Sequence, residues 1–313
     1  MVNFNFENSA PMRISDLVSA WDIFIIDMAL LSESHEAARI RAPDPLFIDR
    51  LRGAVGNVLL RAASPQARRR QPCSWDPPCT LDVFFGRRKL TAGLDLPKPF
   101  VMGVEADGDD PSVWHLSVTI FGTAGDWGPA LVDALSQSLT EGIHPPRDRR
   151  GPPDRFTVMD RTLTANPPAL APPAAPADAL LTFATPLVQD RQGAPLLDVG
   201  ALLTGLGNRI SGLARWMDLQ LDADWSSLRE EARSRPWHAD AMTPITLERG
   251  SGFSKTGVLK GFSGSLLIRE LGDDLLTLLT LGTTCHAGAR AALGFGRYSL
   301  LIVDRDSWLD HRA

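Results

Sequence analysis

Apolar residues in the first half of the chain form an alternating series of strand-like and helix-like segments. Three strand-like runs lie at 21–31, 113–122 and 154–163. Between them, apolar residues recur at helical spacing over 45–64 and 128–142, which predicts two amphipathic helices. Pro45 lies near the expected start of the first helix, where the missing proline N–H leaves no hydrogen bond unmade.

The second half shows a similar alternation with one further strand-like segment. Its strand-like segments are 179–190, 244–251, 258–271 and 296–304. Apolar residues at helical spacing over 196–217, and a leucine-rich run over 273–285, predict two further helices. A strand–helix–strand–strand–helix–strand order is typical of a ferredoxin-like domain. The pattern therefore predicts an α+β chain with two tandem ferredoxin-like (RRM-like) domains.

A segment of almost pure proline and alanine, "NPPALAPPAAPAD" at 166–178, separates the two halves. Such a composition is semi-extended and cannot pack into a core, so we interpret it as a linker. We accordingly predict an N-terminal domain over 1–165 and a C-terminal domain over 179–313. The second domain contains the glycine-rich stretch "HAGARAALGFGRYSL" at 286–300.

Composition narrows the class of protein. The 313 residues are 44% hydrophobic, as expected for a globular chain with real cores. No apolar run reaches the roughly 18 residues of a membrane span, and the N-terminus does not show the pattern of a signal peptide. Three cysteines make no even disulfide framework. We therefore expect a protein of the reducing cytoplasm, without a membrane partner.

The net charge of −5 argues against a uniformly basic nucleic-acid binder, but local patches decide binding. Basic residues cluster at 68–89, at 147–150, and around Arg290 and Arg297. Each cluster is either a contact surface for nucleic acid or a set of solvated loop charges. The composition alone does not choose between these two interpretations.

Seven blocks of the sequence carry a resemblance to a known family. They are "LRGAVGNVLL" (51–60), "CSWDPPC" (73–79), "KPFVMGV" (98–104), "VTIFGTAGDW" (118–127), "TFATPLVQDRQG" (182–193), "GFSGSLLI" (261–268) and "HAGARAALGFGRYSL" (286–300). In their order and spacing, they resemble the CRISPR-associated repeat-RNA (pre-crRNA) processing endoribonucleases of the RAMP superfamily. The first block is similar to that family's first helix, and the last to its glycine-rich loop.

The resemblance implies a protein that binds the stem-loop of a CRISPR repeat and cuts precursor RNA into guide RNAs. It implies no metal and no other cofactor, because the ribose 2′-hydroxyl is the nucleophile. The protein must then align this hydroxyl, move protons and stabilise the phosphate charge. The implied partners are the repeat RNA and other subunits of a CRISPR effector complex.

The resemblance does not directly identify the catalytic residues. Members of the family commonly carry a histidine on or just after the first helix, and the corresponding segment, 62–70, has none. Arg68, Arg69 and Arg70 lie there instead, as candidates to stabilise the phosphate or simply to grip the RNA backbone. His35 is the candidate histidine, with an exposed loop residue as the alternative. If no catalyst is present, the alternative function is a non-catalytic RNA-binding subunit of an effector complex.

We expect both domains to contact RNA. The candidate residues are Arg52, Lys255, Lys260, His286, Arg290, Gly294, Gly296 and Arg297. Arg52 is expected to open the first helix, where amides and charge suit a phosphate, unless it forms an ion pair within the domain. Lys255 and Lys260 lie in a glycine-rich hairpin that suits a duplex stem. His286 either reaches RNA or caps the preceding helix as a cation.

The cluster at 68–89 also contains aromatic residues and two cysteines. Trp75, Phe84 and Phe85 are candidates to stack on unpaired bases, although Phe84 or Phe85 is expected in the core. Cys73 and Cys79 are too few for a structural zinc, which takes four ligands, so we expect no metal site.

Overall fold

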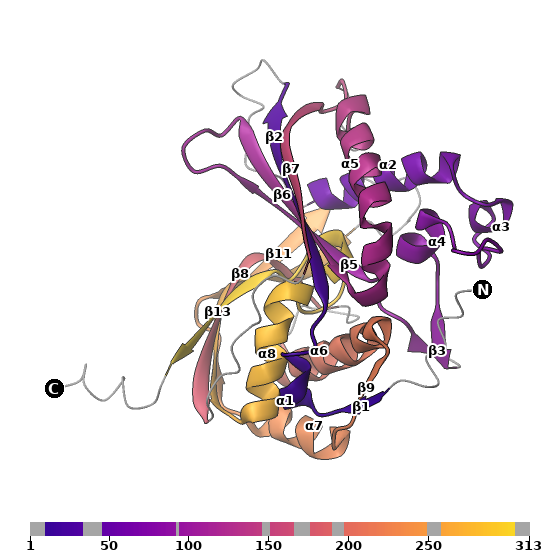
Figure 1. Ribbon diagram of the computed structural model, residues 1–313. Helices are drawn as coiled ribbons and strands as arrows, with labels where there is room; N and C mark the ends of the chain where they lie inside the picture. Colours follow the sequence, from indigo (N-terminus) through magenta and orange to yellow (C-terminus); the bar gives the residue numbers. More distant parts are fainter. Residues whose placement is uncertain are drawn as a thin grey trace.

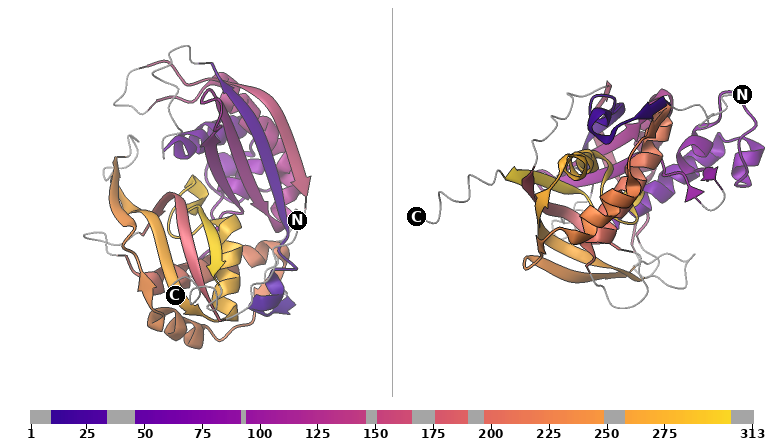
Figure 2. Two further views of the ribbon diagram at one scale, coloured as in Figure 1. Left: turned by 90° about the vertical axis from the view of Figure 1, so that its left-hand side faces the viewer. Right: turned by 90° about the horizontal axis from the view of Figure 1, so that it is seen from below.

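A computed structural model shows two antiparallel sheets, each covered by helices (Figure 1). It describes residues 10–33, 46–91, 94–145, 151–165, 176–189, 197–248 and 258–303. Both sheets turn their open faces to the same side of the molecule, and the helices lie behind them (Figure 2, left). The predicted class, α+β with tandem ferredoxin-like domains, is confirmed.

The first sheet has the strand order of a ferredoxin-like fold. Its strands, from edge to edge, are β5 (Phe100–Ala106), β6 (Val113–Phe121), β2 (Ile23–Ser32) and β7 (Phe156–Ala165). Helices α2 (Phe47–Arg61) and α5 (Gly128–Glu141) cover one face (Figure 1). Ile26, Met28 and Leu30 of β2 are buried, whereas Asp27 between them is exposed, because successive side chains of a strand point to opposite faces.

The second sheet repeats the arrangement. Its main strands are β11 (Met242–Glu248), β12 (Val258–Leu271), β8 (Ala177–Val188) and β13 (Tyr298–Val303), and the short β10 (Trp237–His238) also pairs with β12. Its helices are α6 (Val199–Ala214), α7 (Trp225–Ser234) and α8 (Asp273–Cys285). The predicted helix 273–285 agrees with α8 at both ends, and the other predicted strands and helices lie within a few residues of those observed.

The first described residues of the chain lie against the second half. Strand β1 (Ala10–Met12) pairs in parallel with β9 (Leu219–Leu221), and the short helix α1 (Ile14–Leu17) follows it. Beyond α1, Trp21 Nε1 donates a hydrogen bond to Thr284 Oγ1 of α8 at 3.0 Å. The two halves are thus joined by more than the segment that connects them.

The predicted linker, 166–178, lies mostly outside the described residues. Its last two residues already belong to β8, which begins at Ala177. The division of the chain at this segment stays a prediction. Among the described residues, no helix is long and apolar enough to cross a membrane.

Trp216 lies at the contact between the two halves and bonds to residues of the first. It lies in a short 3-10 turn, Arg215–Met217, and is buried. Its indole Nε1 donates to Pro97 O at 3.1 Å, and its carbonyl accepts from Thr123 Oγ1 at 3.1 Å. Gly122 has φ +56°, and a Cβ there would lie 2.1 Å from Trp216 O. Glycine is therefore required at position 122 for the halves to approach this closely.

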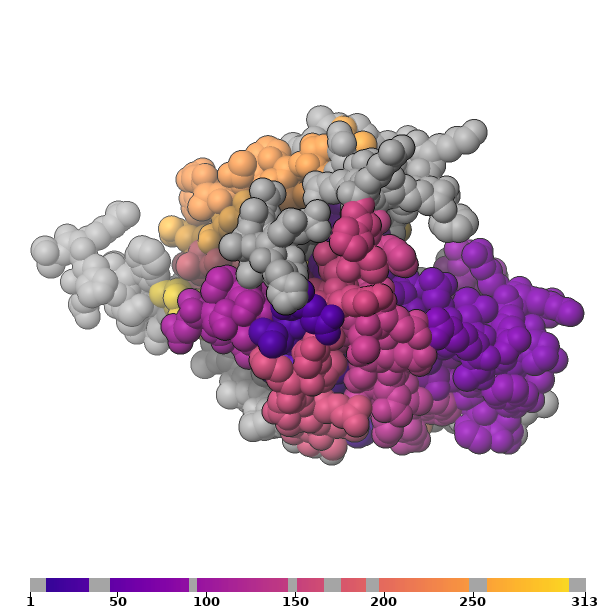
Figure 3. Space-filling model, turned by 90° about the horizontal axis from the view of Figure 1, so that it is seen from above, coloured from indigo at the N-terminus to yellow at the C-terminus, as the bar shows by residue number. Residues whose placement is uncertain are grey.

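An insertion between α2 and β5 builds a separate lobe. Its elements are α3 (Pro65–Arg68), α4 (Thr80–Phe85), β3 (Lys89–Thr91) and β4 (Leu94–Asp95). The lobe projects at one end of the molecule, drawn in purple in Figure 3. Ser64 begins α3 as its N-cap, and its Oγ accepts the Ala67 N–H at 3.1 Å.

Candidate functional site

A cavity of about 630 Å³ lies where this lobe meets α2. Four arginines line it: Arg52 from α2, Arg68 and Arg70 from α3 and the turn after it, and Arg87 from the turn after α4. We call this cavity, with its four arginines, the arginine groove. Such a concentration of guanidinium groups suits the phosphates of a nucleic acid.

The floor of the arginine groove is aromatic. The Arg52 guanidinium carbon lies 4.8 Å from the centroid of the Phe85 ring, a cation–π distance. Gly56, one turn further along α2, lets the ring approach, since a Cβ there would lie 3.3 Å from Phe85 Cε1. Phe84 is buried in the core and meets Phe100 edge-on. Phe85 therefore faces the groove and Phe84 the interior, as one of the two was expected to do.

The position predicted for Arg52 at the start of the first helix is wrong. Helix α2 begins at Phe47, so Arg52 lies in its second turn, where backbone amides already bond within the helix. The apolar residues Phe47, Ile48 and Leu51 are buried and extend the helix in the N-terminal direction. Arg52 contributes its side chain to the groove, and not a helix terminus.

Two residues of the arginine triplet line the groove, and the third does not. Arg68 and Arg70 line the groove, and Arg69 is not part of its lining. Arg68 Nη2 donates to Arg61 O at 2.7 Å, which ties the turn to the C-terminal end of α2. Arg70 has φ +62°, so the chain reverses there. Two of the three predicted residues thus lie together with Arg52.

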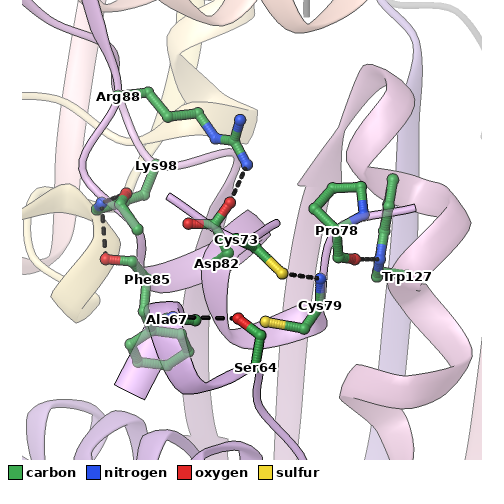
Figure 4. Close-up of polar contacts among 11 residues, drawn as sticks. Ser64, Ala67, Cys73, Pro78, Cys79, Asp82, Phe85, Arg88, Lys98 and Trp127 are labelled. Carbon is green, nitrogen blue, oxygen red and sulfur yellow. Dashed lines mark hydrogen bonds and ion pairs between the residues drawn. The ribbon is translucent and has the colours of Figure 1, made fainter. Parts of the chain in front are cut away.

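Charged residues behind the groove strengthen its positive character (Figure 4). Asp82, the acidic residue of the lining, is already paired with Arg88 at 2.8 Å. Lys98 donates from Nζ to Phe85 O at 3.0 Å and also to Gly86 O. Burial, followed by the charges of Arg52, Arg88 and Arg87, lowers the pKa of Lys98 to about 8.

The glycine-rich loop lies between α8 and β13, and its backbone is occupied within the protein. Gly294 and Gly296 have φ +84° and +69°. The Gly294 N–H donates to Ala291 O and the Gly296 N–H to Pro186 O, each at 2.9 Å. Gly294 and Gly296 were predicted to contact RNA, but their amides already have internal acceptors and are not free to donate to an RNA phosphate. Because glycine has no Cβ, the loop can pack closely against its neighbours at both positions.

His286 is buried at 4% exposure, so the prediction that it contacts RNA is wrong. It ends α8, and its N–H donates to Gly282 O at 2.8 Å, so the alternative of a helix-capping position is confirmed. Burial, followed by the charges of Arg209 and Arg297, lowers the pKa of His286 to about 3. The capping contact is made by the backbone, and the buried ring is a neutral imidazole, not the cation expected.

The two arginines of the loop have different positions. Arg290 is exposed and has φ +65°, at the start of the 3-10 turn Ala291–Leu293. Arg297 is half-buried and reaches across to the first sheet, where it pairs with Glu105 of β5. Neither residue lines the arginine groove.

The remaining candidates are not brought to the groove. Lys260 is exposed on β12, opposite Thr246 of β11. His35 and Lys255 lie outside the described residues. Sequence reasoning missed Arg87 and Lys98 as individual residues. The signal for Arg87 was its place at the end of the basic cluster 68–89, whereas nothing in the sequence marked Lys98 as buried.

Cys73 and Cys79 are free thiols beside the groove. Within the described ranges, no three His, Cys, Asp or Glu side chains gather in a way that could hold a metal ion.

Comparison with known proteins connects this architecture to one family. Residues 181–298 match the family CRISPR-associated endoribonuclease Cas6. A solved Cas6 product complex is 15% identical, with a TM-score of 0.55. Thermus thermophilus Cas6 is 16% identical, with a TM-score of 0.51. Each similarity covers 90% of this chain and 99% of the other, and at these identities it shows the fold. No curated protein matches the sequence.

Proposed function

We propose that this chain, a CRISPR repeat-processing endoribonuclease of the Cas6 type, holds its RNA in the arginine groove and cuts it by 2′-hydroxyl attack, without a metal. The observation that carries the proposal is the convergence of Arg52, Arg68, Arg70 and Arg87 on one cavity. Three separate backbone segments supply these residues. A solvated loop would expose its charges in different directions, whereas these share one concave surface.

The chemistry that we propose needs only RNA and side chains. The 2′-oxygen loses its proton and attacks the neighbouring phosphorus, and the bond from phosphorus to the 5′-oxygen breaks. The products are a 2′,3′-cyclic phosphate and a 5′-hydroxyl. Arg68 and Arg70 would stabilise the extra charge on the phosphate, since guanidinium groups bind such oxygens in pairs. Lys98 adds positive charge behind them.

The general base is a separate question, because arginine hardly deprotonates. His286 is buried and its Nδ1 does not reach solvent, so it is unsuited to this role. His35 therefore remains our candidate for the base, as a prediction on a residue outside those described. It precedes α2, the helix that carries Arg52.

We also propose the repeat stem-loop as the RNA partner, and subunits of a CRISPR complex as protein partners. Two RNA-binding domains, divided near residues 166–178, would share the stem-loop. The cavity in the lobe and the exposed Arg290 and Lys260 of the second half offer positive charge from both units.

The test is cleavage of the cognate repeat RNA in EDTA, with analysis of the product ends. We expect a 2′,3′-cyclic phosphate, and no cleavage when the nucleotide before the scissile bond is a deoxynucleotide. Arg68→Ala and Arg70→Ala should each slow single-turnover cleavage by at least about tenfold. Arg69→Ala is the matched control, because Arg69 is a neighbour outside the groove lining.

Tight binding of intact RNA, with no product at a large excess of protein, would overturn the proposed cleavage and favour a non-catalytic RNA-binding subunit. Equal effects of the three arginine substitutions would overturn the assignment of the groove.

A further inference from the structure

Cys73 and Cys79, the ends of the block "CSWDPPC", take no part in the function proposed above. We infer that they form a dithiol site for peroxide, in which Cys73 is oxidised first and Cys79 then closes a reversible disulfide. The inference rests on the contact of Cys73 Sγ with the Cys79 backbone, on the donors around Cys73, and on the contrast with the third cysteine of the chain.

The two residues are already in contact (Figure 4). The Cys79 backbone N–H donates to Cys73 Sγ at 3.3 Å, and both thiols are free. Cys73 Sγ therefore lies against the backbone nitrogen of Cys79, which is two bonds from the Cys79 Cβ. The two thiols also interact with each other, so we expect a disulfide to need only local adjustment of the two side chains.

The surroundings of Cys73 favour the thiolate. Burial alone would raise the pKa of Cys73. Hydrogen bonds from the Ser64 hydroxyl, the amides of Cys79 and Trp75, and the Cys79 thiol outweigh burial, so the pKa lies below its usual value. Arg88 also interacts electrostatically with Cys73, and its own partner is Asp82. The thiolate is the form that reacts with peroxide.

Access separates the three cysteines. Cys73 is half-buried, so we expect a small oxidant to reach it before Cys79, which is buried. Cys285 is fully buried in α8, and burial raises its pKa to about 11. Two pKa units above the ordinary value leave it about a hundredfold less thiolate. Cys285 therefore serves as an internal control that should not react with peroxide.

The proposed chemistry balances with one peroxide molecule for each disulfide. The Cys73 thiolate attacks one oxygen of hydrogen peroxide, the O–O bond breaks, and a sulfenic acid and hydroxide form. The Cys79 thiolate then attacks the sulfenic sulfur, which forms the S–S bond and releases hydroxide. The two sulfur atoms together lose two electrons, and the peroxide gains them. A dithiol reductant reverses the reaction.

The site has a defined place in the lobe. Arg70, which lines the arginine groove, lies three residues before Cys73. Cys79 is the N-cap of α4, whose Leu81, Asp82 and Phe85 also line the groove. A disulfide would fasten these two segments of the lining to each other. The sulfur chemistry does not depend on bound RNA, so its failure is distinguishable from a failure of RNA cleavage.

The experiment treats the reduced full-length protein with hydrogen peroxide, blocks the remaining thiols and maps the peptides by mass spectrometry. We expect one Cys73–Cys79 disulfide, reversed by dithiothreitol, with Cys285 still reduced. In Cys79→Ser, oxidation should stop at a Cys73 sulfenic acid that dimedone traps. In Cys73→Ser, Cys79 should stay reduced. Cys285→Ser should behave as the unchanged protein.

Circular dichroism before and after treatment shows that each variant is folded. A folded protein without the disulfide would overturn the inference. It would equally be overturned if Cys285 reacted as fast as Cys73, or if Cys79 formed the sulfenic acid in Cys73→Ser.

Discussion

Arg297, at the end of the glycine-rich loop, forms an ion pair with Glu105 of β5, so the loop joins the second sheet to the first. Its side chain passes over Gly103, where a Cβ would lie 3.1 Å from Arg297 Nη1. The Arg297 N–H also donates to Thr185 Oγ1 at 2.9 Å. Arg297 therefore connects β5 of the first sheet to Thr185 of β8 in the second.

We predict that Arg297→Ala lowers stability more than it lowers RNA affinity. A partly exposed pair of this kind contributes up to about 1 kcal/mol. Glu105→Ala should reproduce most of that loss, and the double variant should show a coupling in a urea-unfolding cycle. An additive double variant would contradict a stabilising ion pair. A Glu105→Ala protein that binds RNA several-fold more tightly would show that Arg297 serves RNA instead.

Gly296 makes the closest backbone contact in the loop. A Cβ there would lie 1.8 Å from Ala287 O, and φ is +69°. Gly296→Ala should lower the free energy of unfolding by at least about 2 kcal/mol, since positive φ alone contributes about 1–3 kcal/mol of strain. Chemical denaturation measures the difference.

The matched control is Gly53→Ala in α2, where the new methyl group would meet nothing within 4 Å. There we expect a gain of about 0.5–1 kcal/mol, because alanine favours a helix interior. Equal effects at positions 53 and 296 would contradict the close contact of Gly296.

The periodicity of the sequence predicted most of the fold because local pattern and tertiary structure agree. Helix α2 is a clear case, because Leu51, Val55 and Leu59 recur at helical spacing and are all buried. Helix α7 escaped notice, since only Leu228 and Ala232 of its residues are buried and the rest of the pattern is polar. Its N-cap, Asp224, was the available signal.

The candidate site was only partly predictable. Composition marked the arginines of 68–89 as a cluster, but their convergence with Arg52 depends on how the lobe folds back onto α2. For Gly294 and Gly296, glycine implied close approach, and the sequence does not say to what. The answer, internal carbonyl and aliphatic groups, required the packing of the loop against Ala287 and Ile48.

The buried His286 should make the protein sensitive to acid. Its pKa is lowered from 6.5 to about 3, so below pH 6.5 the unfolded chain binds a proton that the folded protein does not. Its contribution to stability is therefore complete above pH 6.5 and is lost as the pH falls towards 3. The slope is at most about 1.4 kcal/mol per pH unit.

His286→Asn removes the titrating group, so its unfolding free energy should fall less steeply between pH 6.5 and 5. Urea unfolding at several pH values measures both slopes. Parallel curves for the two proteins would contradict a neutral, buried imidazole.

Lys98 should make the stability of the protein depend on pH in the alkaline range. Its pKa is lowered from 10.5 to about 8, so between these values the folded protein holds fewer protons than the unfolded chain. Its contribution to stability should therefore rise as the pH increases from 8 to 10.5. The difference in stability between the unchanged protein and Lys98→Met should grow over this range. A difference independent of pH would show that Lys98 titrates normally.

The arginine groove should reveal itself in the salt dependence of RNA binding. Each guanidinium that meets a phosphate releases counterions, so its loss reduces the slope of log K against log salt by about 0.7–0.9. We expect this change in Arg52→Gln, Arg70→Gln and Arg87→Gln, which all lose a charge from the groove. Arg69→Gln loses the same charge outside the lining and should keep the original slope. Filter binding of uncut, deoxy-substituted repeat RNA between about 50 and 200 mM salt measures all four slopes. If Arg69→Gln changed the slope as much as Arg70→Gln, the net charge of the lobe would control binding, and the geometry of the groove would not.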